Sequence, residues 1–194
     1  MPNIPENGLL NFLQKFEQLP AEVLSAVDSC TSRIALPKKT ILLKKGKICD
    51  YLYFIEKGMA RNYYKAEEKE LTIDITVEGA LLTSFSSFVS RQPSNEVIEL
   101  MEDCQLVAIH YNDLQQLYQT YPVMERIGRL IAEHNYNSLK NHNYMLKFNS
   151  TTERYEYLFN NKIEIIRRAP IGIIASYLGM SIETLSRIRS KHEI

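Results

Sequence analysis

Near the C-terminus, the stretch "IIASYLGMSIETLSRIRSKHEI" (173–194) combines a glycine-centred turn with a segment carrying two arginines and a lysine. Within it, Ala175 is a small residue and Gly179 lies four positions later. A helix-turn-helix needs both, because its two helices cross closely and its turn residue takes a positive φ. Leu185 and Ile188 follow at positions where the second helix must face inward. The spacing predicts a helix-turn-helix, and the alternative is an unrelated helical hairpin with this pattern by chance.

The second helix of this unit is expected to present polar and basic side chains outward, with Ser181 as its N-cap. Arginine can donate two hydrogen bonds to guanine, and glutamate can accept one from cytosine. Serine, threonine and lysine bind phosphates or base edges. The residues predicted to contact DNA are Ser181, Ile182, Glu183, Thr184, Ser186, Arg187, Arg189 and Lys191.

The overall charge is zero, which excludes a general attraction to nucleic acid, but the charge is unevenly distributed. Residues 167–194 contain five Lys/Arg and two Asp/Glu, a local charge of +3, so the remainder carries −3. Apolar residues make up 45% and charged residues 24% of the 194 residues, as in an ordinary globular protein. A basic C-terminal segment on an acidic body permits a local contact with DNA.

Several classes of protein receive no support from the sequence. Cys30, Cys49 and Cys104 are far apart and form no Cys-x-x-Cys pair, so no metal ligands and no cofactor are identified. Free thiols, the lack of a signal-peptide pattern and the lack of a long apolar run predict a cytoplasmic protein without a membrane partner. No catalytic residues are assigned and no enzyme is expected, because the carboxylates are scattered and no G-x-S-x-G, H-E-x-x-H or P-loop motif occurs.

From Arg33 to His110 the apolar pattern is typical of short strands. The stretch "LTIDITV" (71–77) alternates, which predicts a half-buried strand with Leu71, Ile73, Ile75 and Val77 on its buried face. The polar segment 65–70 before it indicates a hairpin. Further strand-like runs are 51–55, 97–101 and 106–110. Many short strands with turns predict a compact antiparallel barrel or roll.

Helical patterns flank this strand region. Residues 9–16 and a second segment that starts at Pro20 each place apolar residues on one face. After the strands, Asn112 and Gln115 form a capping-box pattern at the start of another helix.

Residues 122–148 form the longest helical pattern, which spans about 40 Å at about 1.5 Å per residue. Side chains at alternating three- and four-residue spacing form a heptad-like seam. We expect this helix to form a dimer interface, and the alternative is a long helix that lies on the barrel. The predicted interface residues are Ile127, Ile131, His134, Ser138, Asn141 and Met145.

A capping box at Ser150 and Glu153 and the polar stretch 149–152 mark the best domain boundary. The predicted parts are a sensor domain over 1–121, a dimerisation helix over 122–148 and a helix-turn-helix domain over 149–194. The fold class is α+β.

The stretch "IASYLGMSIETLSRIRSK" (174–191) resembles the reading motif of the Crp/Fnr transcription regulators, with Glu183, Ser186 and Arg187 as the E-x-x-S-R pattern of the Fnr branch. The stretch "KKGKICDYLYFIEKGMAR" (44–61) is similar to the β-roll of cyclic-nucleotide-binding domains. The resemblance implies an N-terminal antiparallel β-roll, also described as a double-stranded β-helix. It also implies a homodimer that reads an inverted repeat of double-stranded DNA with half-sites about 34 Å apart.

The resemblance further implies a half-site similar to TTGA and RNA polymerase as a further partner. Family members continue after the reading helix into a β-hairpin wing. Few residues follow Lys191 in this sequence, so most of a wing is expected to be lacking.

The resemblance also shows what this roll lacks. Members that bind cyclic nucleotides carry Gly-Glu-x-Gly and an Arg-Ser or Arg-Ala pair, whereas Ser84 and about Ser94 stand at the charged positions here. The loss removes charge-assisted hydrogen bonds worth roughly 1.5–3 kcal/mol each, so we expect no tight binding of cAMP or cGMP. Either the pocket is vestigial, or it takes an unknown small-molecule effector. The candidate pocket residues are Thr83, Ser84, Ser86, Ser87 and Arg91.

The sequence therefore predicts a DNA-binding transcription regulator with a β-roll sensor domain, a dimer helix and a helix-turn-helix. The alternative is a ligand-binding or protein-interaction module whose C-terminal segment has lost DNA binding.

Overall fold

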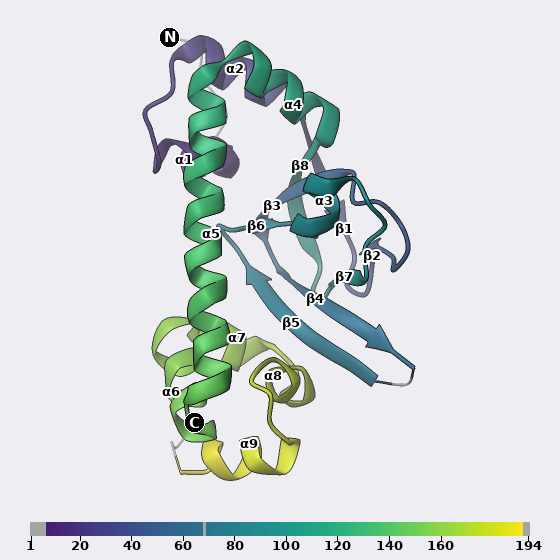
Figure 1. The fold of residues 1–194 in the computed structure, drawn as a ribbon, viewed down its shortest axis with the longest axis vertical. Helices are drawn as coiled ribbons and strands as arrows, with labels where there is room; N and C mark the ends of the chain where they lie inside the picture. The colour runs from purple at the N-terminus through teal and green to yellow at the C-terminus, as the bar shows by residue number, and fades with distance from the viewer. Residues whose placement is uncertain (1–6, 68, 192–194) are drawn as a thin grey trace.

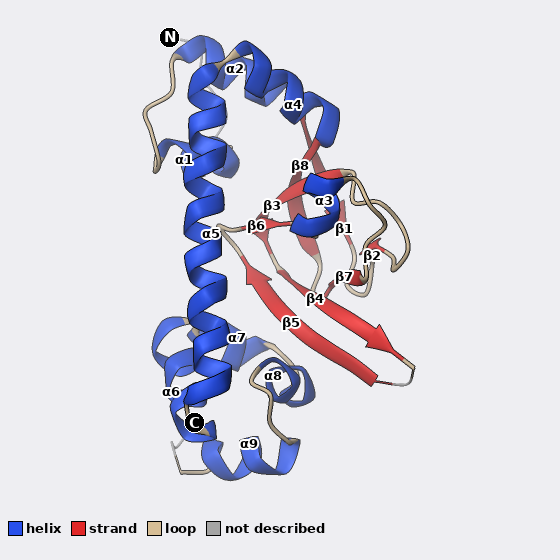
Figure 2. Ribbon diagram, viewed as in Figure 1, coloured by secondary structure: helices blue, strands red, loops and turns tan. Residues whose placement is uncertain are grey.

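The computed structural model describes residues 7–67 and 69–191 of the chain. A single long helix, α5, extends along the molecule, with a β-roll beside it and a group of short helices at its C-terminal end (Figure 1). All the described strands precede α5, so the class is α+β (Figure 2). The described helices are α1 (Gly8–Gln14), α2 (Ala21–Ser29), α3 (Phe85–Ser90), α4 (Tyr111–Thr120), α5 (Pro122–Phe148), α6 (Thr151–Asn161), α7 (Ile163–Arg168), α8 (Ile171–Tyr177) and α9 (Ile182–Arg189). No helix among them is long and apolar enough to cross a membrane.

The roll consists of two four-stranded antiparallel sheets, with strand orders β1-β8-β3-β6 and β2-β7-β4-β5. The strands are β1 (Thr31–Leu36), β2 (Ile41–Leu43), β3 (Tyr51–Lys57), β4 (Met59–Ala66), β5 (Lys69–Val77), β6 (Leu81–Leu82), β7 (Glu96–Leu100) and β8 (Cys104–His110). Leu106, Val107 and Ile109 of β8 are all buried, because β8 lies between two strands and beneath the flanking helices. The first hydrophobic core joins these residues to α1, α2, α4 and the start of α5. The predicted antiparallel roll is confirmed.

The predicted alternation along β5 is only partly correct. Thr72 is 3% exposed, whereas Leu71 is 54% exposed, the reverse of the prediction. The ladder with β4 pairs Asn62 with Asp74 and then Tyr63 with Thr72, so Ile73 is an extra residue on β5. Such a bulge interrupts the alternation, so the side chains before Ile73 lie on the opposite face from the one that an unbroken alternation with Ile75 predicts. Ile75 nevertheless remains buried, as predicted.

Helix α4 begins two residues earlier than its capping-box pattern indicated. Its N-cap is His110, whose Nδ1 accepts the N–H of Asn112 at 3.2 Å. An imidazole nitrogen can fill the role that was expected of the Asn112 side chain, so the sequence pattern alone could not fix this boundary.

Helix α5 has the predicted bounds, with Pro122 in its first turn, but its ends pack on their own chain. Ile127 is 1% exposed in the first core, and Met145 is 4% exposed in the second. The prediction that these two side chains face a partner is therefore corrected. Ile131 is partly buried against the first core, whereas His134, Ser138 and Asn141 are exposed. The exposed large apolar side chains of α5 are instead Tyr136, Leu139, Tyr144 and Phe148.

A second hydrophobic core holds α6 to α9 together. Its largest fully buried side chains include Tyr155, Leu158, Ile165 and Ile166. The predicted capping box at the start of α6 is confirmed. The N–H of Ser150 donates to Glu153 Oε2 at 2.6 Å, and the N–H of Glu153 donates to Ser150 Oγ at 3.3 Å.

His142 of α5 is partly buried beside Tyr177 of α8. Its ring stacks on that of Tyr177 with centroids 4.6 Å apart. Burial lowers the pKa of His142 from its ordinary value, and the nearby Lys162 lowers it further, while Asp74 opposes the shift. Because the unfolded chain then binds the proton more tightly, His142 favours folding above its unfolded pKa of about 6.5.

We therefore expect the thermal midpoint of the protein to fall as the pH decreases from about 7.5 to 5, through the ordinary pKa of histidine. His142→Phe keeps a stacking ring but cannot be protonated, so its midpoint should fall less over this window. His134→Gln, at an exposed position of the same helix, is the control and should follow the wild type. Identical pH profiles for wild type and His142→Phe would contradict this role.

Candidate nucleic-acid interface

Helices α8 and α9 have the helix-turn-helix geometry that the sequence predicts. Ala175 is 2% exposed where the two helices meet, and Gly179 has a φ of +62° in the turn. A side chain at Gly179 would be strained at this φ and would contact Arg154. Leu185 and Ile188 are 0% and 6% exposed, so one face of α9 is anchored in the second core.

The first turn of α9 is capped as expected. Ser181 Oγ accepts the backbone N–H of Thr184 at 3.2 Å. Glu183 also lies in this turn, and its own backbone N–H, together with the hydroxyl of Ser181, lowers the pKa of its carboxyl group. Glu183 is therefore ionised at neutral pH and can accept hydrogen bonds.

The face of α9 opposite the core is open to solvent. Of the predicted contact residues, Ser181, Ile182, Glu183, Ser186, Arg187 and Lys191 are exposed, and Thr184 and Arg189 are partly buried. Within the described part of the chain, none of the three basic side chains on this list forms an ion pair. Unpaired cations on an exposed helix can bind an anionic partner without first losing an internal partner.

A recess of about 170 Å³ lies between the start of α6 and the end of α9. It is lined by Thr151 and Thr152 of α6 and by Arg187, Ile188 and Lys191. Hydroxyl groups and cations that converge on one recess are suited to an anionic group such as a backbone phosphate. The two threonines are not among the residues predicted to contact DNA, although their place in the capped first turn of α6 could have indicated them.

Arg154 is a second residue whose role the sequence did not reveal. Its guanidinium group donates to the carbonyl groups of Leu146 at 2.6 Å and Asn149 at 3.0 Å, near the end of α5. It also donates to the carbonyl groups of Leu178 at 3.1 Å and Gly179 at 3.3 Å, in the turn before α9. Arg154 therefore satisfies carbonyl groups at two helix ends and fixes the turn relative to α5.

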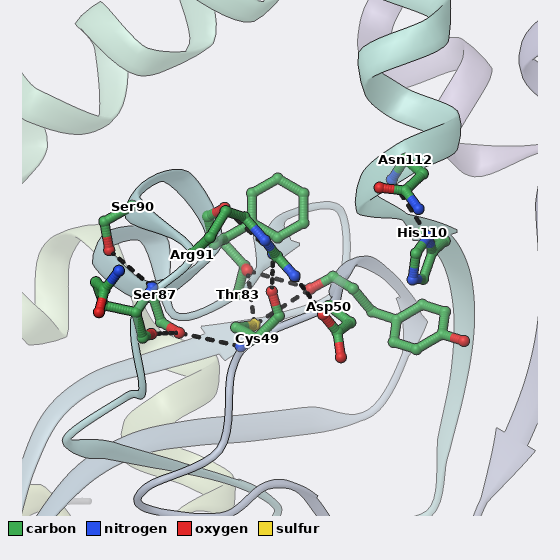
Figure 3. A network of polar contacts seen from close by, with 11 residues as sticks. Cys49, Asp50, Thr83, Ser87, Ser90, Arg91, His110 and Asn112 are labelled. Atoms are coloured by element: carbon green, nitrogen blue, oxygen red, sulfur yellow. Dashed lines mark hydrogen bonds and ion pairs between the residues drawn. The ribbon is translucent and has the colours of Figure 1, made fainter.

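In the candidate effector pocket, most of the predicted side chains form hydrogen bonds within the protein, and Figure 3 shows those of Thr83, Ser87 and Arg91. Ser84 and Ser94, which are 0% and 3% exposed, lie with their hydroxyl oxygens 3.0 Å apart. Ser87 Oγ accepts the N–H of Cys49 at 3.0 Å and donates to the carbonyl of Gln92 at 2.6 Å. Thr83 Oγ1 donates to the carbonyl of Tyr51 at 3.2 Å. Ser86, by contrast, is exposed on α3.

Arg91 is the basic residue of the candidate pocket, and its side chain contacts partners other than these serines. It follows α3 in the left-handed conformation, with a φ of 58°. Its guanidinium group donates to the carbonyl of Cys49 at 2.7 Å and forms an ion pair with Asp50 (Figure 3). It also lies 4.1 Å from the ring centroid of Tyr111. An anionic ligand would therefore compete with Asp50 for Arg91, and the pocket role of Arg91 stays a prediction.

Asn62 of β4 presents a hydrogen-bond acceptor to the interior of the roll. Asn62 is 6% exposed, and its Oδ1 is buried without a partner. Its Nδ2 donates to Glu96 Oε2 and to the carbonyl of Thr83, both at 3.0 Å. In the described residues, no group of three or more His, Cys, Asp or Glu side chains could hold a metal ion.

Comparison with protein families supports the assignment of the roll. The model of the cyclic nucleotide-binding domain family matches residues 33–121. None of the curated proteins matches the sequence significantly.

Similar solved structures cover nearly the whole chain. A putative Crp/Fnr-family transcriptional regulator from Eubacterium rectale is 15% identical with a TM-score of 0.71, over 94% of this chain and 88% of that one. FixK2 from Bradyrhizobium japonicum is 17% identical with a TM-score of 0.70, over 83% of both chains. A CooA mutant from Carboxydothermus hydrogenoformans is 18% identical with a TM-score of 0.69, over 97% of this chain and 85% of that one.

The chain therefore has the fold of the Crp/Fnr transcription regulators. Within that fold, residues 33–121 match the model of the cyclic nucleotide-binding domain family.

Proposed function

We propose that this protein is a transcription regulator that binds double-stranded DNA as a homodimer. Each α9 would enter the major groove at one half of an inverted repeat. The observation that carries the proposal is the exposed face of α9, where Glu183, Ser186 and Arg187 lie opposite a buried face. Such a regulator acts in the cytoplasm on promoter DNA, with RNA polymerase as a further partner.

The roles of the α9 residues follow from their chemistry. Arg187 reads a guanine, and Glu183 orients Arg187 or accepts from the opposite cytosine. Arg189 and Lys191 neutralise phosphates. Lys191 lines the recess beside α6, which supports its role. A half-site similar to TTGA is the corresponding target.

Replacing Arg187 tests the reading role. Arg187→Ala should weaken binding to the selected operator by about 1–3 kcal/mol and relax preference at one base position. The measurement is competitive binding to operators that carry each substitution in turn. Arg167→Ala is the control, because Arg167 is exposed on α7 and, among the described residues, its ion pair is with Glu164 of the same helix. Equal binding of wild type and Arg187→Ala would rule out the role.

The dimer is proposed to form through the exposed side of α5. Tyr136 and Leu139 are 66% and 58% exposed on a helix whose two ends are held by its own chain. Burial of these side chains against a second copy would provide the apolar contact that the originally predicted seam cannot supply. His134, Ser138 and Asn141 lie nearer the face that continues from Ile127 to Met145.

Leu139→Glu should therefore weaken the dimer. Because burial of a leucine contributes about 1.5–3 kcal/mol, the dissociation constant should rise by at least about tenfold, as measured by sedimentation. Ser138→Glu is the matched control and should leave the dimer intact. If Ser138→Glu dissociates the dimer and Leu139→Glu does not, the interface lies instead on the face predicted from the sequence, which contains Ser138.

We propose that the roll does not respond to cAMP. A cyclic phosphate needs donors and positive charge, whereas Ser84 and Ser94 bond to one another and Asn62 presents an unpaired acceptor. Calorimetric titration with cAMP and cGMP should give no binding in the low micromolar range. A low micromolar or tighter dissociation constant for either nucleotide would contradict this proposal.

A further inference from the structure

The helix-turn-helix is packed directly against the roll as well as joined to it through α5. Met59, Ile75 and Met101 of the roll belong to the same hydrophobic core as the buried side chains of α6 to α8. In Figure 1, α7 and α8 lie between α5 and the sheet that contains β5. The direction of α9 is therefore set by a contact between two parts of the chain that are distant in sequence.

Ser176 of α8 forms one polar part of this contact. Strand β5 is the edge of its sheet, so backbone groups on its outer side have no neighbouring strand. The N–H of Thr72 donates to Ser176 Oγ at 2.9 Å, and Ser176 Oγ donates to the carbonyl of Glu70 at 3.4 Å. One hydroxyl thus satisfies a donor and an acceptor of the edge strand.

Arg168, the last residue of α7, forms the other polar part. Its Nη1 and Nη2 donate to the two carboxylate oxygens of Glu78 at 2.9 and 2.8 Å. Its Nε donates to Glu102 Oε1 at 3.0 Å, and Nη2 also pairs with Glu102. Glu78 and Glu102 lie in two different turns of the roll, after β5 and after β7. A planar guanidinium group that holds two carboxylates fixes direction as well as distance.

The roll in turn fixes these carboxylates. Glu78 Oε1 also accepts the N–H of Gly58 at 2.8 Å. The hydrogen bond from Arg168 is the largest reason that the pKa of Glu78 is lowered to about 2, so Glu78 stays ionised across the pH range of DNA-binding experiments. The ion pair therefore connects a rigid turn of the roll to the helix just before the helix-turn-helix.

The connection matters because the two α9 helices of a dimer must match the spacing of two half-sites. Half-sites read by such dimers lie about one helical turn apart, so a change in the angle between α9 and α5 changes the operator that fits. Leu185 and Ile188 pack α9 into the same core as α6, α7 and α8, and these four helices (151–189) are here called the reading head.

We propose that Arg168 and Ser176 are positioning residues that hold the reading head on the roll and thereby set the half-site spacing the dimer accepts. This inference rests on the proposed function. Neither residue needs to touch DNA, because both act through the orientation of α9.

The test is binding of the full-length dimer to a series of inverted repeats whose central spacer is shortened or lengthened by one and two base pairs. The wild type should prefer one spacer. Arg168→Met should reduce the ratio between the best and the next-best spacer by about tenfold, as expected for the loss of charge-assisted hydrogen bonds. Preference for the half-site sequence should not change. Ser176→Ala should shift the ratio in the same direction by a smaller factor.

Arg167→Met is the matched control, since Arg167 is the neighbouring arginine on α7 and its ion pair with Glu164 is local. It should keep the wild-type spacer preference. Arg168→Lys keeps the charge but not the fork geometry, and it should give an intermediate ratio. If Arg168→Met does not fold, as judged by circular dichroism, Glu102→Gln tests the same contact while the pair with Glu78 remains.

Two failures can be distinguished. If the wild type binds a specific half-site and folded Arg168→Met or Glu102→Gln keeps the wild-type spacer preference, the positioning role is wrong and the proposed function stands. If the wild type binds no duplex specifically at any spacing, the proposed function is wrong and the positioning role falls with it.

Discussion

The second hydrophobic core is the constraint on which the arrangement of the molecule depends, because residues of the roll and of the C-terminal helices build it together. Met59 and Ile75 of the roll pack with α6 to α9, and Met145 brings in the end of α5. Polar contacts then fix the orientation of the C-terminal helices relative to α5 and the roll. Arg154 ties the turn of the helix-turn-helix to α5, and Arg168 ties α7 to the roll. The exposed face of α9 is consequently presented at a fixed angle rather than on a free tether.

The roll keeps the architecture of a cyclic nucleotide-binding domain while its interior chemistry differs. Where such domains that bind nucleotides place a glutamate and an arginine, Ser84 and Ser94 bond to one another and are almost fully buried. Two neutral hydroxyl groups can satisfy each other inside a core at little cost, whereas unpaired charges could not. The serine pair is therefore compatible with the fold, and it is one basis of the proposal that the roll does not respond to cAMP.

Much of the fold could be predicted from the sequence because local rules govern it. Gly179 lies where the turn requires a positive φ, Ser150 and Glu153 cap α6, and the bounds of α5 follow from Pro122 and an unbroken helical pattern. The predictions were wrong where contacts between distant parts of the chain determine which side chains are buried. A seam of period 3.5 shows that one side of a helix is buried but not against what, so Ile127 and Met145 were assigned to a partner.

Other parts of the site depended on contacts that no spacing reveals. The bulge at Ile73 reverses the burial of Leu71 and Thr72. Arg168 pairs with Glu78, which is 90 residues away in the chain. The outward residues of α9 were placed correctly because burial of Leu185 and Ile188 fixes the helix rotation. The most direct test of the account is selection of bound sequences from random duplex DNA with the full-length protein. The account predicts enrichment of an inverted repeat whose half-sites lie one helical turn apart. Recovery of unenriched sequences from the folded protein would contradict it.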